Sequence, residues 1–205
     1  MKILNLYAGI GGNRKNWGDE HEITGVENVP HVAEVYRHFY PNDTVVEADA
    51  HQYLLDHYQE FDFIWSSPPC PSHSKMNTAR MGHGMPIRYP DMRLYQEIIF
   101  LREWASARWV VENVEPYYPA LIMPAMALGR HFFWSNFVIT KTEEYKPHSG
   151  NLTHNTVSDL GKGHGIELPS GTKDQRRLLR NAVDPRLGQH ILKAALKETK
   201  QESLL

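Results

Sequence analysis

The chain has 205 residues, 41% of them hydrophobic, and a formal net charge of -2 at pH 7. This length can bury one substantial core, and no apolar run approaches the roughly 20 residues that a membrane-spanning helix needs. We expect the amino terminus to be a core strand rather than a signal peptide, and the single cysteine excludes an internal disulfide. These features predict a protein of the reducing cytoplasm, and alternating strand and helix signals predict a single α/β domain over residues 1–205.

Charge is distributed unevenly along the chain. The first 60 residues are acidic, whereas residues 161–205 carry nine Lys and Arg against five Asp and Glu. The basic part is compatible with a face that binds nucleic acid, although basic runs more often form ordinary solvated surface.

The first predicted strand covers residues 1–7 and runs into a glycine-rich turn at 8–13. Such a turn between a strand and a helix lets a nucleotide-like ligand approach the backbone at the positive end of the helix. Glycine-rich turns also serve as ordinary tight connections, and the spacing differs from the Gly-x-Gly-x-x-Gly of dinucleotide-binding folds. The turn therefore indicates a ligand site only in combination with other features.

Two further predicted strands end near acidic residues. Residues 22–26 form a short strand followed by Glu27, and a β-branched run at 45–46 leads to Asp49. Glu27 could accept hydrogen bonds from two ribose hydroxyls, and Asp49 could accept one from an adenine amino group. Each acid alone is more often a solvated loop residue, but three strand ends in register predict a cofactor-binding crevice.

Cys70, the single cysteine, follows the apolar run 61–65 and the dipeptide Pro68-Pro69. A lone cysteine is most often a small buried hydrophobic residue. Here its neighbours are prolines, serines and a histidine, which build turns rather than cores, and consecutive prolines stiffen the backbone. We therefore interpret Cys70 as a reactive thiol at a strand end.

Residues 75–90 show no periodicity and contain two glycines and two prolines. Loops of this length are uncommon unless they form a lid or a binding segment, so we expect one of these, with a disordered excursion as the alternative. A helix is predicted from Asp91. Its core-facing stripe is expected to consist of Leu94, Ile98, Leu101 and Trp104.

Two strands are predicted farther on, at residues 109–114 and 130–139. Residues 140–173 are polar and too poor in apolar side chains to form a core of their own. The chain has 12 histidines, but none occurs at a recognised metal-ligand spacing, so we predict no metal site.

Five segments resemble, in order, the motifs of the DNA (cytosine-5)-methyltransferases, and together they cover most of the chain. Residues 6–12 resemble the cofactor loop of that family, residues 26–28 its ribose-binding strand end, and Asp49 its adenine contact. Residues 68–74 resemble its nucleophile loop.

The last two motifs lie in the second half of the chain. Residues 109–114 match the strand with the Glu-Asn-Val sequence that contacts the target cytosine. Residues 180–185 resemble the element that closes the cofactor site, with Arg180 where glycine is usual.

The resemblance implies a doubly wound, mostly parallel sheet of the S-adenosylmethionine-dependent methyltransferase (Rossmann-like) type. It implies S-adenosylmethionine as the cofactor and DNA as the partner. The cofactor-binding residues that it implies are Tyr7, Ala8, Gly9, Ile10, Gly11, Gly12, Glu27, Asn28, Asp49, Ala50, Pro68, Asn181 and Val183.

The resemblance also implies a mechanism at carbon 5 of cytosine. Cys70 would add to carbon 6 and turn the ring into an enamine that can attack a sulfonium methyl group. Glu112 would protonate or hydrogen-bond nitrogen 3, and a surface salt bridge is the alternative reading of this acid. Arg130 would hold the cytosine carbonyl, although the motif matches loosely and a structural arginine is equally compatible.

Further substrate contacts are expected from Ser74 and Asn113 in the matching motifs. If residues 75–90 close over an extruded cytosine, Arg80 and Arg88 would lie on phosphates. About 40 residues separate Ile139 from Asn181, where the family usually inserts a much larger target-recognition domain. We therefore expect a reduced recognition region at about 140–173 and a closing element at 174–205. Specificity would then be short or relaxed, or shared with a second subunit, such as a homodimer partner.

Three alternatives remain at this point. The letters Ser66-Ser67-Pro68-Pro69 also resemble the loop of methyltransferases that modify exocyclic amino groups, but those enzymes need an aromatic residue where this chain has Cys70. One branch of the cytosine-5 family methylates transfer RNA, and the short recognition region does not decide between the substrates. A non-catalytic DNA-binding relative is disfavoured by the intact Cys70 and Glu112.

Overall fold

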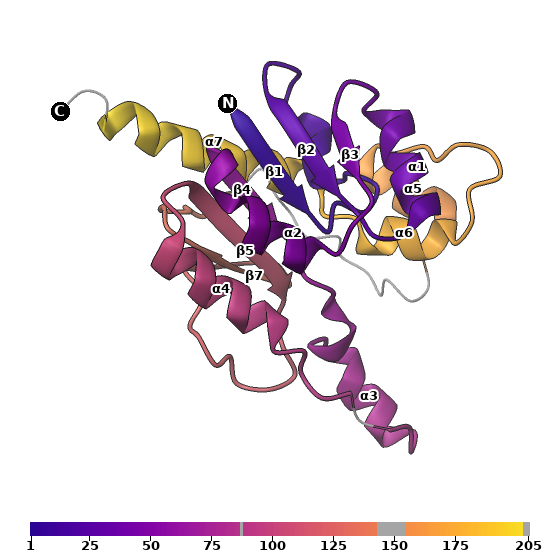
Figure 1. Ribbon diagram of the computed structural model, residues 1–205. Helices are drawn as coiled ribbons and strands as arrows, with labels where there is room; N and C mark the ends of the chain where they lie inside the picture. The colour runs from indigo at the N-terminus through magenta and orange to yellow at the C-terminus, as the bar shows by residue number, and fades with distance from the viewer. Residues whose placement is uncertain (87, 143–154, 203–205) are drawn as a thin grey trace.

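The computed structural model describes residues 1–86, 88–142 and 155–202, and the chain forms a seven-stranded sheet flanked by helices (Figure 1). The strand order is β3-β2-β1-β4-β5-β7-β6. The strands are β1 (Lys2–Leu6), β2 (Glu22–Val26), β3 (Thr44–Val46), β4 (Phe63–Ser66), β5 (Arg108–Val114), β6 (Met126–Leu128) and β7 (His131–Ser135). Pairing is parallel except for β7, which runs antiparallel to both neighbours. The predicted doubly wound, mostly parallel α/β fold is confirmed.

The strand order reverses between β1 and β4, and this reversal positions the site. The chain builds outward from β1 to β2 and β3 on one side, then crosses back to β4 and β5 on the other. Parallel sheets of this kind bind ligands in the crevice beyond the carboxyl ends of the strands at the reversal. The segments that follow β1, β2, β4 and β5 therefore meet at one edge.

Both faces of the sheet are covered, as its apolar strands require. The helices are α1 (Pro30–Phe39), α2 (Ala50–His57), α3 (Met76–Gly82), α4 (Arg93–Trp104), α5 (Val157–His164), α6 (Gln175–Asn181) and α7 (Pro185–Glu202). One core joins α2 and α4 to the sheet through residues such as Leu54 and Ile98. The core on the opposite face joins α7 to it through Leu187 and Ile191.

The glycine-rich turn does not open a regular helix, contrary to expectation. It leads into a single 3-10 turn, η1 (Asn13–Asn16), because the chain must return to β2 within a few residues. The carboxyl-terminal helix α7 packs against η1 instead, and the indole N–H of Trp17 donates to the Gly188 carbonyl at 3.1 Å. A Cβ at Gly188 would lie 2.2 Å from the Asn13 carbonyl oxygen, so this approach requires glycine.

Three more sequence expectations about local structure were wrong, and one strand was missed. The segment expected to be a loop at 75–90 contains α3, and β6 was not predicted. The second half of the strand expected at 130–139 lies outside β7, which ends at Ser135. Trp104 is 60% exposed because it is the last residue of α4, whereas the other three members of its predicted stripe are buried.

The polar region expected at 140–173 does not form a core of its own in its described part. Leu160 of α5 and Ile166 are buried against α1 and α6 in a small third core. The stretch 143–154 lies outside the described residues. Among the residues that the structure describes, no helix combines the length and apolar character needed to cross a membrane.

Candidate active site

A cavity of about 470 Å³ lies at the carboxyl ends of the strands on both sides of the reversal. Its volume is in the range of small-molecule and cofactor sites. Most residues that the sequence nominated line it: Tyr7, Ala8, Gly9, Ile10, Gly12, Glu27, Asn28, Asp49, Ala50, Pro68, Cys70, Ser74, Glu112, Asn113, Arg130, Asn181 and Val183. The nominated residues outside this lining are Gly11, Arg80 and Arg88. The structure thus brings together segments from the ends of five strands, β1 to β5, and the carboxyl-terminal part of the chain.

Residues 7–12, here named the glycine loop, follow β1 and are tied to the end of β2. The backbone N–H of Gly9 donates to one carboxylate oxygen of Glu27 at 3.0 Å, and the N–H of Val29 donates to the other at 2.9 Å. Gly9 has a φ of 56°, in the left-handed region that favours glycine. Each oxygen of Glu27 keeps a further lone pair toward the cavity that it lines, so the carboxylate can still accept from a ligand hydroxyl.

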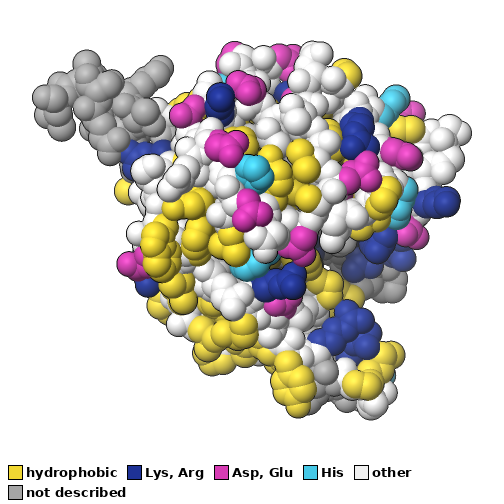
Figure 2. All heavy atoms as spheres, in the orientation of Figure 1, with side chains coloured by type: hydrophobic (Ala, Val, Ile, Leu, Met, Phe, Trp, Pro, Cys, Tyr) yellow, Lys and Arg dark blue, Asp and Glu magenta, His cyan; other side chains and the backbone are white. Residues whose placement is uncertain are grey.

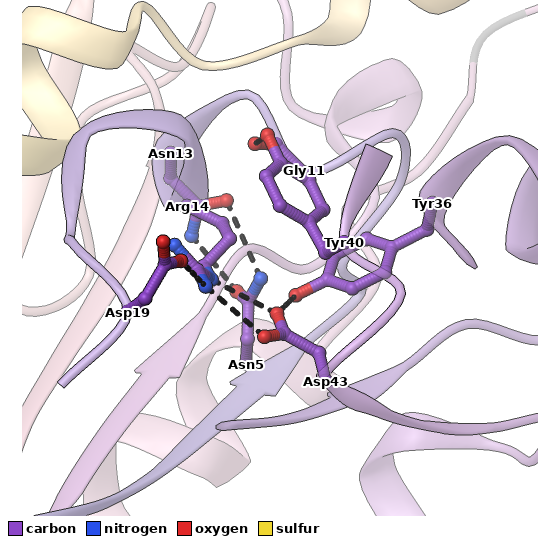
Figure 3. Close-up of polar contacts among 8 residues, drawn as sticks. All are labelled: Asn5, Gly11, Asn13, Arg14, Asp19, Tyr36, Tyr40 and Asp43. Atoms are coloured by element: carbon purple, nitrogen blue, oxygen red, sulfur yellow. Dashed lines mark hydrogen bonds and ion pairs between the residues drawn. The ribbon is translucent and has the colours of Figure 1, made fainter. Parts of the chain in front are cut away.

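A buried polar network holds the glycine loop from behind (Figure 3). The guanidinium of Arg14 binds both carboxylate oxygens of Asp43, at 2.9 and 3.1 Å, and the Tyr36 hydroxyl donates to the same carboxylate. Tyr40 lies with its ring centroid 4.9 Å from the guanidinium carbon and donates its hydroxyl to the Gly11 carbonyl at 2.7 Å. The loop is therefore fixed through Gly11 to a paired, buried charge, which the sequence analysis missed because the partners are far apart in the chain.

The carboxyl-terminal part of the chain closes over the glycine loop. A Cβ at Gly12 would lie 2.5 Å from the Val183 carbonyl oxygen, so only glycine permits this contact. Asn181 and Val183 line the cavity beside it, together with Arg177 and Arg180, which the sequence analysis did not assign to the cofactor site.

Asp49 has a structural partner on each oxygen. It caps the first turn of α2 by accepting from the Gln52 N–H at 2.9 Å, and it pairs with Arg93 at 3.3 Å. The backbone hydrogen bond is the main cause that lowers the pKa of Asp49. The carboxylate is thus ionised and fixed at the cavity wall, as an acceptor for a ligand amino group must be.

Residues 67–74, here named the cysteine loop, follow β4 and carry Cys70 into the cavity. The side-chain amide of Asn113 on β5 donates to the Pro68 carbonyl at 2.9 Å, and the indole N–H of Trp65 donates to the Ser67 hydroxyl at 2.7 Å. Asn113 thus holds the cysteine loop, and its expected contact with a substrate stays a prediction. Cys70 is partly exposed, as a thiol that must meet a substrate has to be.

Glu112 on β5 lines the same cavity and is 6% exposed. Burial raises the pKa of Glu112 to about 7, although a hydrogen bond from Ser67 and the charge of Arg130 oppose the rise. Burial is also the main cause that raises the pKa of the Cys70 thiol, followed by the nearby Glu112 carboxylate, while Arg130 and Arg180 lower it. The carboxyl group can therefore donate or accept a proton near neutral pH.

Strand pairing places a histidine beside Glu112. In the antiparallel pair of β5 and β7, Glu112 lies opposite Phe133 and Val114 lies opposite His131, so Glu112 and His131 share one face of the sheet. Their nearest nitrogen and oxygen are 3.7 Å apart, which is longer than a hydrogen bond. Burial lowers the pKa of His131 to about 3, so its imidazole is neutral. Strand alternation at 130–139 could have identified this residue, but the expectation singled out Arg130.

The two arginines proposed to bind phosphates lie away from the cavity lining. Arg80 belongs to α3, which projects from the body of the molecule (Figure 1). Arg88 follows this helix, and its backbone carbonyl accepts from the Asn77 amide at 2.6 Å. Their proposed phosphate contacts stay predictions. Basic side chains that do line the cavity come from Arg93, Arg130, Arg177 and Arg180. Figure 2 shows Lys and Arg side chains gathered on the side of the molecule where Figure 1 draws α3 and α6.

The geometry agrees with the comparisons to known proteins. A family model described as C-5 cytosine-specific DNA methylase matches residues 1–115, a range that includes Cys70 and Glu112. A comparison with curated proteins finds no match.

Two solved structures resemble the fold across nearly the whole chain. Entamoeba histolytica methyltransferase EhMeth has a TM-score of 0.61 at 10% identity, with 97% of this chain and 98% of that chain covered. A mutant of Spodoptera frugiperda DNMT2 has a TM-score of 0.60 at 14% identity, with 95% and 99% covered. At these identities the similarity concerns the fold, while the family model covers more than half of the sequence. The chain belongs to the C-5 cytosine-specific DNA methylase family.

Proposed function

We propose that the chain transfers the methyl group of S-adenosylmethionine to carbon 5 of cytosine in DNA through a covalent adduct with Cys70. The observation that carries the proposal is the single cavity that holds both Cys70 and the buried Glu112 together with the glycine loop and Glu27. A thiol beside an acid whose pKa lies near neutrality is the pairing that nucleophilic addition to a pyrimidine requires.

The described residues fit the methyl donor. At Gly9 the glycine loop offers the cavity a stretch of backbone without a side chain, and the spare acceptor capacity of Glu27 suits the two ribose hydroxyls. Asp49, Asn181 and Val183 line the same cavity. Asp49 would accept from the adenine amino group, and Asn181 and Val183 would close the cavity over the ligand. When bound, S-adenosylmethionine supplies an electrophilic methyl group on its sulfonium.

The protein side of the chemistry begins with the Cys70 sulfur, which forms a bond to carbon 6 of the cytosine while the thiol proton leaves to solvent or a neighbouring base. Negative charge then develops at nitrogen 3, and a protonated Glu112 donates its proton there. The Arg130 guanidinium, close enough to shift the pKa of both groups, is the candidate to hold the cytosine carbonyl. The proton on carbon 5 is later removed, and the sulfur leaves as the ring regains its aromatic character.

Cytosine inside a duplex cannot reach Cys70, so a DNA substrate must present an extruded or single-stranded base. Arg177 and Arg180 of α6 are among the arginines that line the cavity, and they would contact the flanking phosphates. Target recognition by residues 140–173 would be limited to a few bases, or shared with a second copy of the chain.

Transfer RNA is the main alternative substrate. Purified protein should be given S-adenosylmethionine with a labelled methyl group and, separately, duplex DNA, single-stranded DNA and transfer RNA. The proposal expects label in DNA, and bisulfite sequencing of that DNA then gives the position and the sequence motif. Label in transfer RNA alone would mean that the protein methylates transfer RNA and not DNA. Label in neither nucleic acid would favour a non-catalytic relative. Cys70→Ala should remove the label, and Ser106→Ala, at an exposed position before β5 at the opposite edge of the sheet, is its matched control.

A further inference from the structure

A fully buried carboxylate lies beneath the cavity without lining it. Glu97 is on α4, and its side chain is inaccessible to solvent. It accepts hydrogen bonds from the Tyr7 hydroxyl at 2.6 Å, the Ser66 hydroxyl at 2.6 Å and the His51 Nδ1 at 3.0 Å. A buried carboxylate is stable only when its oxygens are satisfied in this way, and here all three partners are donors.

The three donors belong to three different segments of the site. Tyr7 is the first residue of the glycine loop and follows β1, and Ser66 ends β4 directly before the cysteine loop. His51 lies in the first turn of α2, two residues after Asp49. Glu97 therefore connects the glycine loop, on the cofactor side of the cavity, to the strand that leads into the cysteine loop.

The backbone conformation of Tyr7 shows what its hydrogen bond to Glu97 does. Tyr7 has a φ of 55°, a left-handed backbone conformation that residues other than glycine rarely adopt and that persists only where surrounding contacts enforce it. The short hydrogen bond from its hydroxyl to Glu97 is one such contact, because it fixes the ring while the backbone turns toward Ala8.

We propose that Glu97 is a positioning residue that sets the glycine loop and the cysteine loop in register with each other, a role that rests on the proposed methyl transfer. It touches neither ligand, since it does not line the cavity. It acts through Tyr7 on the cofactor side and through Ser66 on the nucleophile side. Because the two carboxylate oxygens of Glu97 accept separately from the two hydroxyls, each loop is fixed by its own bond to the same point of α4.

The test uses two measurements that need no turnover. The first is the affinity for S-adenosylmethionine by calorimetry, which reports on the glycine loop. The second is the rate at which iodoacetamide alkylates the protein, which reports on the cysteine loop because Cys70 is the single cysteine. Glu103→Gln on the same helix, whose side chain is 50% exposed and pairs with its neighbour Arg102, is the matched control.

We expect a crossed pattern, in which the Tyr7 and Ser66 substitutions each change a different one of the two measurements. Tyr7→Phe should weaken cofactor binding about tenfold, the scale of one lost hydrogen bond to a charged group, and leave alkylation within about twofold. Ser66→Ala should leave cofactor binding nearly unchanged. It should accelerate alkylation about threefold or more, because the loop around the half-buried thiol loosens. Glu97→Gln should change both, and in its background the other two substitutions should add little.

A residue that only stabilises the fold would lower the melting temperature and leave both measurements on the folded protein unchanged. That outcome for Tyr7→Phe and Ser66→Ala overturns the proposal even if Glu97→Gln fails to fold. Full additivity of the substitutions with Glu97→Gln also overturns it. An absence of methyl transfer by the wild type, with the crossed pattern intact, would instead refute the proposed function and leave the positioning role standing.

Discussion

Neutralising Glu112 should make the stability of the protein less dependent on pH. The carboxyl group has a pKa of about 7 in the folded chain against the ordinary 4.5, because burial disfavours its charged form. Between pH 4.5 and 7 the folded protein therefore holds a proton that the unfolded chain has released. Stability falls as pH rises through this window, by 1.36 kcal/mol per unit, which amounts to about 3 kcal/mol across it. Below the window the contribution is fully present, and above pH 7 the loss is complete.

Glu112→Gln removes this dependence while keeping the size of the side chain. The free energy of unfolding by urea should be measured for both proteins at intervals from pH 4.5 to 8.5, and the difference between them taken at each pH. We expect the unfolding free energy of the variant, relative to that of the wild type, to rise by about 3 kcal/mol between pH 4.5 and 7 and then to stay constant. Glu103→Gln, at an exposed position, gives the reference for neutralising a carboxylate. A difference that stays constant with pH would refute both the burial of Glu112 and its role as an acid near neutrality.

Three further substitutions test other parts of the site. Cys70→Ala should abolish methyl transfer and leave S-adenosylmethionine binding nearly intact by calorimetry, because the thiol acts on the cytosine; loss of both would make Cys70 structural. Glu27→Ala should weaken cofactor binding by about 1–3 kcal/mol, since ligand hydroxyls lose a charged acceptor, and an unchanged affinity removes Glu27 from the site. Asp43→Ala leaves the buried Arg14 with only the exposed Asp19 as an acidic partner and should cost about 3–5 kcal/mol of unfolding free energy in urea. A cost below about 1 kcal/mol would mean that the pair does not hold the glycine loop.

The sheet could be predicted because each of its central strands has a recognisable local sequence pattern. β4 is buried at every position and begins with three apolar residues, and each strand of the cofactor half is followed within three residues by a glycine or an acid that a crevice can use. Strand ends of a parallel sheet meet at one edge, so Glu27, Asp49 and Cys70 could be placed together without coordinates.

The supporting contacts could not be predicted, because their partners are distant in sequence. Glu97 contacts Tyr7 across 90 residues of sequence, and Arg14 contacts Asp43 across 29, while in the sequence each of these residues looks like an ordinary polar or charged side chain. The glycine loop is followed by η1 instead of a regular helix, and α7 from the other end of the chain packs against η1. This arrangement is likewise decided by packing between distant parts of the sequence. Propensity carries no information about such pairings.

The covalent step is the central claim, and 5-fluorocytosine tests it most directly. Addition of Cys70 at carbon 6 is reversed only after the proton on carbon 5 is lost, and fluorine cannot leave as a cation. DNA with 5-fluorocytosine at a methylated position should therefore hold the protein in a complex that survives denaturing electrophoresis. The complex should require both the methyl donor and Cys70, and Glu112→Gln should slow its formation, because the amide cannot protonate nitrogen 3. If no such complex forms on DNA that the wild type demonstrably methylates, the addition of the thiol to cytosine is contradicted.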